Sequence, residues 1–73
     1  MDFIKTVPGL SREMQRAGVS QADLSRAMDV SPQAVHKWVV GLTIPKAAHL
    51  IRLARFLDCS VDDLLRADGE GLQ

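Results

Sequence analysis

SQADLSRAMDVSPQAVHKWVVGLTIP, residues 20 to 45, decides the fold of this 73-residue chain, because it holds two helix starts separated by a short turn. Ser20 can accept hydrogen bonds from the amides of a first helical turn, and Asp23, three residues later, completes a capping-box pattern. Ser31 offers a second cap, and Pro32 follows it at the first helical position, where the missing N–H costs nothing. The stretch therefore predicts two short helices joined by a tight turn.

The second of these helices has an apolar face and a polar face at helical spacing. The apolar face holds Val35, Trp38 and Val39, and the opposite face holds Gln33, His36, Lys37 and Val40. Glutamine can pair bidentately with adenine, lysine can donate to guanine, and histidine can donate or accept. A polar helix face is usually only solvated surface, so the spacing alone leaves a DNA-reading face and an ordinary surface equally open. Trp38 could stack on a base, but its place on the Val35–Val39 face favours a core anchor.

A set of positions in and after this stretch shares one joint spacing: Ser20-Gln21, Leu24, Val30-Ser31, Val35, Trp38, Gly41, Pro45, Leu50, Leu53-Ala54, Leu57 and Leu64. At this spacing the chain resembles the Cro-type and phage-repressor-type (Xre-like) helix-turn-helix family over about residues 10 to 66. The resemblance implies an all-α fold, a compact five-helix domain of the lambda-repressor-like type. We expect this domain to span residues 1–67, with the helix-turn-helix at residues 20–41 and a flexible C-terminal tail at residues 68–73.

The resemblance also implies roles for individual side chains on double-stranded DNA. The base-reading positions are Gln33, His36, Lys37 and Pro32, and the backbone-contacting positions are Gln21, Ser31, Thr43 and Lys46. Relatives often place a polar base-reader where this chain has Pro32, so one possible base contact is missing.

Two departures from the family pattern bear on folding. Asp29 stands in the turn where the family favours glycine, and aspartate tolerates a left-handed conformation better than most residues do. Many relatives bury an arginine of the first helix against a glutamate near the end of the second motif helix, and the matching positions here are Met14 and Val39. Because both partners are apolar, no buried charge is left unpaired, and we expect a core contact between them.

The remaining helices follow from apolar spacing and caps. Phe3, Ile4, Val7, Leu10 and Met14 suit an amphipathic first helix, which either kinks at Pro8-Gly9 or properly begins near Pro8. A fourth helix is expected from Pro45 or Lys46 to Asp58, and a fifth over about residues 61–67, which a capping box of Ser60 and Asp63 opens. Part of the apolar surface of these two helices is a candidate dimer interface, formed by Phe56, Val61, Leu64 and Leu65.

The net charge is zero, which is unusual for a DNA-binding protein, but the charges are unevenly distributed. Residues 1–55 carry eight cationic and four acidic side chains, whereas residues 56–73 carry one cationic and five acidic ones. The acidic end should point away from phosphate, and few cations can reach the DNA backbone. We therefore expect modest non-specific affinity and a shallow dependence on salt.

Other sites receive little support from the sequence. Cys59 is the only cysteine, which suits a buried, inert thiol, and His49 is expected at the surface. His36, His49 and Cys59 fit no zinc spacing, so neither a metal nor another cofactor is expected, nor a small-molecule ligand. No apolar run approaches membrane-spanning length and no secretory signal is evident, so we expect a cytoplasmic protein of a prokaryotic or phage-infected cell.

Three classes of function remain open. The leading one is a sequence-specific transcription regulator, a Cro-like repressor that binds as a dimer to a palindromic operator with half-sites about one helical turn apart. The second is a DNA-binding antitoxin or similar module whose C-terminal segment holds a partner protein, although such proteins usually carry a longer extension. The third is an enzyme, and it is poorly supported because the sequence offers no nucleophile with a base, no evident carboxylate pair and no phosphate loop.

Overall fold

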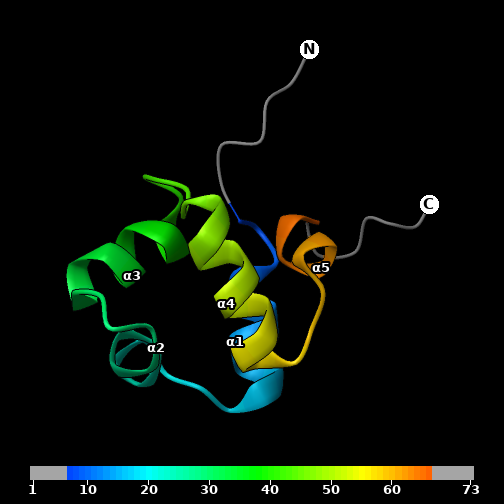
Figure 1. Ribbon diagram of the computed structural model, residues 1–73, viewed down its shortest axis with the longest axis horizontal. Coiled ribbons are helices and arrows are strands. Elements are labelled where there is room, and N and C mark those ends of the chain that lie inside the picture. Colours follow the sequence, from blue (N-terminus) through cyan, green and yellow to red (C-terminus); the bar gives the residue numbers. More distant parts are fainter. Residues whose placement is uncertain (1–6, 67–73) are drawn as a thin grey trace.

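The computed structural model describes residues 7–66, and within them every regular element is a helix (Figure 1). The helices are α1 (Leu10–Ala17), α2 (Gln21–Met28), α3 (Pro32–Val40), α4 (Ala47–Leu57) and α5 (Val61–Leu65). The predicted all-α, five-helix fold is therefore confirmed. The predicted tail at residues 68–73 lies outside the described residues, as do Phe3, Ile4 and Ala67.

The caps expected from the sequence are present at three helix starts. Ser20 and Ser60 each form a capping box, in which the serine hydroxyl accepts from the backbone of Asp23 or Asp63 and each aspartate accepts from the serine N–H, all at 3.0 Å. The hydrogen bond from the serine N–H lowers the pKa of Asp23 and Asp63 below the ordinary value of 3.8, and the serine hydroxyl adds a smaller lowering. Ser31 caps α3 by accepting from the Ala34 N–H at 3.1 Å.

The start of α1 settles the alternative that the Pro8-Gly9 pair leaves open. The helix begins at Leu10, directly after this pair, and the preceding Val7 is already buried. The Gly9 N–H donates to the carbonyl oxygen of Leu64 at 2.9 Å, so the chain before α1 lies directly against α5. α5 ends at Leu65, earlier than the expected limit near residue 67.

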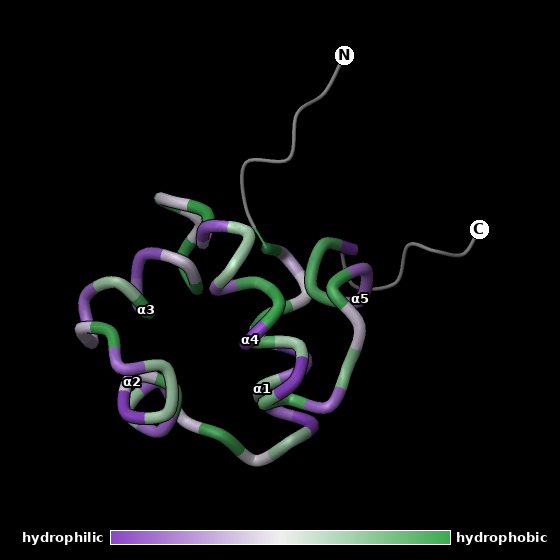
Figure 2. The backbone as a smooth tube through the Cα atoms, viewed as in Figure 1, coloured by the Kyte–Doolittle hydropathy of each residue, from purple (hydrophilic) through white to green (hydrophobic). Residues whose placement is uncertain are grey.

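One apolar core joins all five helices. Its buried side chains come from all five helices and from Val7, which precedes α1: Val7, Leu10, Met14, Leu24, Met28, Val35, Trp38, Leu53, Ala54, Leu57 and Leu64. Val39 is half-buried and packs against this core, which also contains Met14, as the paired apolar replacement predicts. Apolar and polar segments alternate along each helix, as Figure 2 shows, and this is the pattern of amphipathic helices that surround a shared core.

Two arginines of α1 tie this helix to the C-terminal part of the chain. Arg12 donates to the carbonyl oxygen of Asp63 at 2.8 Å, and Arg16 donates to that of Leu57 at 2.7 Å. Glu13 is buried between them and accepts from the Nε of Arg16 at 2.7 Å and from that of Arg12 at 3.3 Å. Hydrogen bonding to Glu13 raises the pKa of Arg16, whose positive charge is therefore fixed. These cations satisfy a backbone carbonyl at the end of α4 and one within α5.

No helix within residues 7–66 is long and apolar enough to cross a membrane.

Candidate nucleic-acid interface

The turn between α2 and α3 is held by its own hydrogen bonds. Asp29 adopts the left-handed conformation with φ of 55°, which is the geometry expected for this substitute for glycine. The Ser25 hydroxyl donates to the Val30 carbonyl at 2.7 Å, and the Val30 N–H donates to the Ser25 carbonyl at 3.1 Å. Sequence reasoning did not identify Ser25, because its partner lies five residues on, outside the usual capping patterns. This reciprocal pair fixes the orientation of α3 relative to α2.

The two faces of α3 divide as the sequence predicts. Val35 and Trp38 are buried, with Trp38 only 5% exposed, so the core interpretation of Trp38 is confirmed. The opposite face is exposed at Gln33, His36, Lys37 and Val40. The sequence predicts His49 at the surface, but the residue is half-buried. Its ring lies 5.5 Å from the ring of Trp38 at a tilt of 48°.

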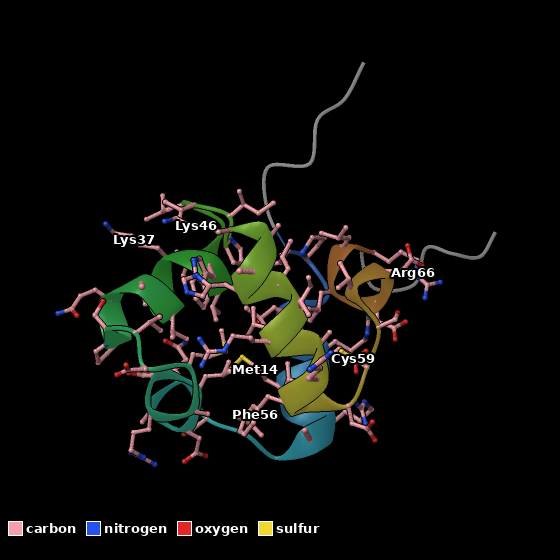
Figure 3. The ribbon with its side chains drawn as sticks, viewed as in Figure 1. Met14, Lys37, Lys46, Phe56, Cys59 and Arg66 are labelled. Atoms are coloured by element: carbon pink, nitrogen blue, oxygen red, sulfur yellow. The ribbon has the colours of Figure 1, made fainter. Side chains whose placement is uncertain are left out.

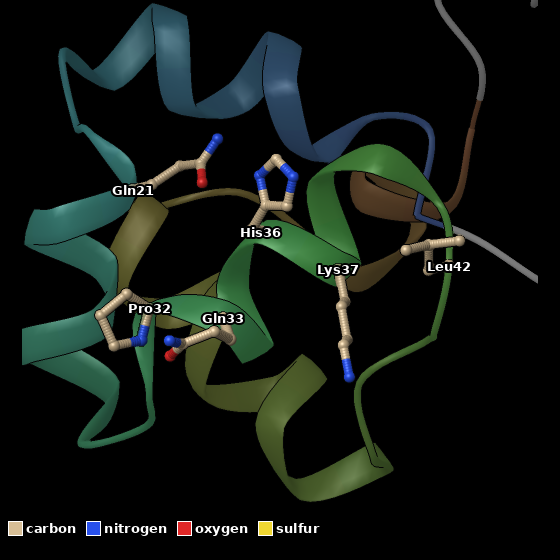
Figure 4. A pocket seen from close by; sticks show the side chains of 6 residues that line it. All are labelled: Gln21, Pro32, Gln33, His36, Lys37 and Leu42. Carbon is tan, nitrogen blue, oxygen red and sulfur yellow. The ribbon is translucent and has the colours of Figure 1, made fainter.

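An open depression of about 410 Å³ lies over the exposed face of α3. Its lining residues are Gln21, Pro32, Gln33, His36, Lys37 and Leu42 (Figure 4). The depression therefore contains all four residues that the resemblance assigns to base reading, together with Gln21 from the start of α2. Leu42 joins them from the loop after α3, although the sequence analysis gave this residue no role.

The loop between α3 and α4 turns back sharply on the end of α3. Gly41 adopts a φ of 85°, which favours glycine, and the Leu42 N–H donates to the Lys37 carbonyl at 2.8 Å. Pro45 is buried, whereas Thr43 and Lys46 are exposed. Thr43, Lys46 and Ser31 do not line the depression. Thr43 and Lys46 follow the C-terminal end of α3, and Ser31 precedes its N-terminal end.

Two lysines lie near α3, whereas a group of acidic side chains lies beside α5 at the other end of the molecule. Figure 3 shows Lys37 and Lys46 near α3 and Arg66 at the far end beside α5. Arg66 lies 2.7 Å from Asp63 and 3.4 Å from Asp62, in the acidic segment that is expected to point away from phosphate. Arg12 and Arg16 bind backbone carbonyls of the C-terminal half, so part of the cationic excess of residues 1–55 serves folding.

The candidate dimer interface needs one correction. Leu64 is 0% exposed in the single chain, because it is enclosed by the core between α1, α4 and α5, so it has no surface to offer a partner. Val61 and Leu65 are half-buried against the same core, and Phe56 is 46% exposed. Large apolar side chains are also exposed at Val40, Leu42, Ile44 and Ile51.

Groups able to hold a metal do not gather in the described part of the chain: among residues 7–66 there is no cluster of three His, Cys, Asp or Glu side chains. Cys59 is half-buried, and desolvation raises the pKa of its thiol above the ordinary value of 9.0. The neutral thiol is therefore favoured, and it packs against the core as an apolar group.

Two solved structures, one of a transcriptional regulator and one of a repressor, are similar to this chain. A transcriptional regulator from Listeria innocua superposes with a TM-score of 0.70 at 30% identity, over 78% of this chain and 53% of that one. This chain thus spans about half the length of that regulator. The SOS-response repressor LexA from Eubacterium rectale has the same fold, with a TM-score of 0.79 at 22% identity over 99% of this chain and 79% of that one. No curated protein sequence matches the chain.

The sequence model of the helix-turn-helix family matches residues 10–64, which include all of α1 to α4 and most of α5. The match covers more than half of the chain and includes the α2–turn–α3 unit and the depression over α3. The chain therefore belongs to the helix-turn-helix DNA-binding family, of the Xre or lambda-repressor type.

Proposed function

We propose that this protein is a sequence-specific transcription regulator that inserts α3 into the major groove of double-stranded DNA. The observation that carries the proposal is the depression, which gathers the base-reading candidates on the exposed side of a helix whose other side is core. Because Val35 and Trp38 fix α3 in the core, the opposite side chains are presented from a rigid element. A rigid polar face is what direct readout of base edges requires.

Within this proposal the side chains have separate tasks. Gln33 pairs with adenine, Lys37 donates to guanine, and His36 donates or accepts, while Pro32 offers no polar group to a base. Gln21, Ser31, Thr43 and Lys46 contact phosphates and set the register. The Ser31 oxygen already accepts from the Ala34 N–H, which leaves its O–H free to donate to a phosphate oxygen.

We propose further that the protein acts as a two-fold dimer on a palindromic operator and represses by occupying DNA. Two copies would place their α3 helices in successive major grooves, about 34 Å apart. Lys46 is the one cation among the phosphate-contacting candidates, so two subunits that each neutralise about one phosphate should give a slope of log K against log salt near −2, which is shallow for a DNA-binding protein. The arginines that bind backbone carbonyls of the C-terminal half support this low number.

The test is selection of random duplex DNA by the purified protein at near-physiological salt. We expect an enriched palindrome with half-sites about ten base pairs apart, bound by two protein chains. An enriched single half-site would contradict the dimer, and the absence of any enriched sequence would contradict sequence-specific regulation. A cell-extract search for a stoichiometric protein partner would then address the antitoxin alternative.

A further inference from the structure

Leu42 is an unusual residue for the surface it occupies. It is 70% exposed, more than any other large apolar side chain within residues 7–66, and it lines the depression beside Lys37. Exposing a leucine to water gains nothing for folding, because its apolar area is left unburied. A single exposed leucine is ordinary on a protein surface, but this one lines the depression, so it is available to contact an apolar group of the ligand.

The position of Leu42 is fixed by the backbone. Its N–H donates to the Lys37 carbonyl at 2.8 Å, and the N–H of Thr43 donates to the same oxygen at 3.4 Å. Gly41 provides the left-handed turn that these bonds need, with φ of 85°, and Pro45 is buried three residues later. Leu42 is therefore held at the end of α3, although it lies outside the helix.

The lining residues follow an ordered sequence along α3. Pro32 lies at one end and Leu42 at the other, with Gln33, His36 and Lys37 between them (Figure 4). α3 has 9 residues, which at 1.5 Å per residue make roughly 13 Å, or about four base pairs at 3.4 Å each. Polar readers thus occupy the centre of the depression, with Pro32 at the first residue of α3 and Leu42 just beyond the last.

Thymine alone among the four bases presents an apolar group in the major groove, its C5 methyl. We propose that Leu42 is a specificity-determining residue that contacts the methyl of a thymine at the edge of the half-site. That base pair would lie next to the one read by Lys37, on the side away from Gln33. This inference rests on the proposed function, since it requires α3 to lie in the major groove.

The test replaces each thymine of the selected operator in turn by deoxyuridine, which removes the methyl and keeps the base-pairing and groove hydrogen bonds. For the unmodified protein, we expect one symmetric pair of positions at which the replacement weakens binding about fourfold per half-site, the effect of one buried methyl. For Leu42→Ala, the same replacement should change the Kd by less than about 1.5-fold. Leu42→Met should restore the sensitivity, because methionine can fill the same space with apolar atoms.

Ile51→Ala is the matched control. Ile51 is also an exposed apolar residue, at 51%, but it lies on α4 and does not line the depression, so this variant should keep the full sensitivity to deoxyuridine. All three variants should melt like the unmodified protein, because both side chains are largely exposed.

Three results would overturn the inference. The unmodified protein could tolerate deoxyuridine at every thymine, or Leu42→Ala could keep the sensitivity. Sedimentation could instead show that Leu42→Ala dissociates the dimer, which would make Leu42 part of a protein contact. If no sequence is enriched from random DNA, the proposed function fails before this test, so the two failures are distinguishable.

Discussion

Replacing Gly9 by alanine should separate α5 from the start of α1. Gly9 has φ of −86° and ψ of −6°, a conformation that any residue can adopt. Glycine is therefore required at this position because a side chain would not fit, and not because of its backbone freedom. A Cβ atom here would overlap the main-chain oxygen of Asp63, and it would lie 3.0 Å from that of Arg66. Because these blocking atoms belong to the backbone of α5 and the residue after it, they cannot rotate away. The start of α1 and α5 must therefore move apart.

The magnitude follows from the contacts that this movement weakens. The hydrogen bond from the Gly9 N–H to the Leu64 oxygen, 2.9 Å long, contributes about 1 kcal/mol. The bond from Arg12 to the Asp63 oxygen, 2.8 Å long and partly exposed, contributes about 1.5 kcal/mol. Partial exposure of Leu64 adds about 1.5 kcal/mol. We therefore expect a loss of about 4 kcal/mol, against a total of roughly 4–11 kcal/mol for a domain of this size.

Urea unfolding followed by far-ultraviolet circular dichroism measures this loss, with Gly18→Ala as the control. Gly18 is left-handed, with φ of 70°, but no atom lies within 4 Å of an added Cβ, so its replacement should cost only about 1 kcal/mol. A Gly9→Ala variant no less stable than Gly18→Ala would refute the close packing of α5 on α1.

Three further predictions concern the core, the site and acid stability. Trp38→Ala should lower the free energy of unfolding by roughly 3–5 kcal/mol in the same assay, and a smaller loss would contradict its role in the core. Gln33→Ala should abolish discrimination between the selected operator and a version altered at the adenine it reads, with an unchanged melting temperature. Gln15→Ala, which alters an exposed glutamine of α1, should leave both the discrimination and the melting temperature unchanged. Because folding lowers the pKa of Asp23 and Asp63, their stabilising effect is complete above the ordinary aspartate value and is lost as the pH falls through the lowered values. Thermal melts below about pH 4 should therefore depend less on pH in the double variant Asp23→Asn, Asp63→Asn.

The three serine-capped helix starts and the faces of α3 could be predicted from the sequence because both are local. When a serine is followed three residues later by an aspartate, the two side chains bond to free backbone N–H groups at the helix start, whatever the rest of the chain does. The division between Trp38 and Gln33 follows equally from the 3.6-residue period of a single helix. Such features need no knowledge of which helices meet.

The features that the sequence did not reveal depend on contacts between distant segments or on turns between the helices. Gly9 reads as a helix breaker, and only the approach of α5 shows that it is a contact point. Leu64 and Phe56 look equivalent as apolar residues of short helices, but the packing of α1 encloses one of them and leaves the other 46% exposed. Leu42 lies in a loop without periodicity, so although Gly41 marks the turn at the end of α3, the sequence does not show that this turn brings Leu42 beside Lys37.

The use of Arg12 and Arg16 within the fold explains how a chain of zero net charge can suit specific DNA binding. Their side chains satisfy carbonyls of the C-terminal half, so they contribute to folding and add little attraction for phosphate. Non-specific binding depends almost entirely on that attraction, whereas base contacts act only at the correct sequence. Because that attraction is independent of sequence, weakening it lowers the affinity at wrong sites and at the correct site alike. The ratio between the two affinities is then set by the base contacts of a rigid reading face. In a genome of competing sites, this ratio decides occupancy.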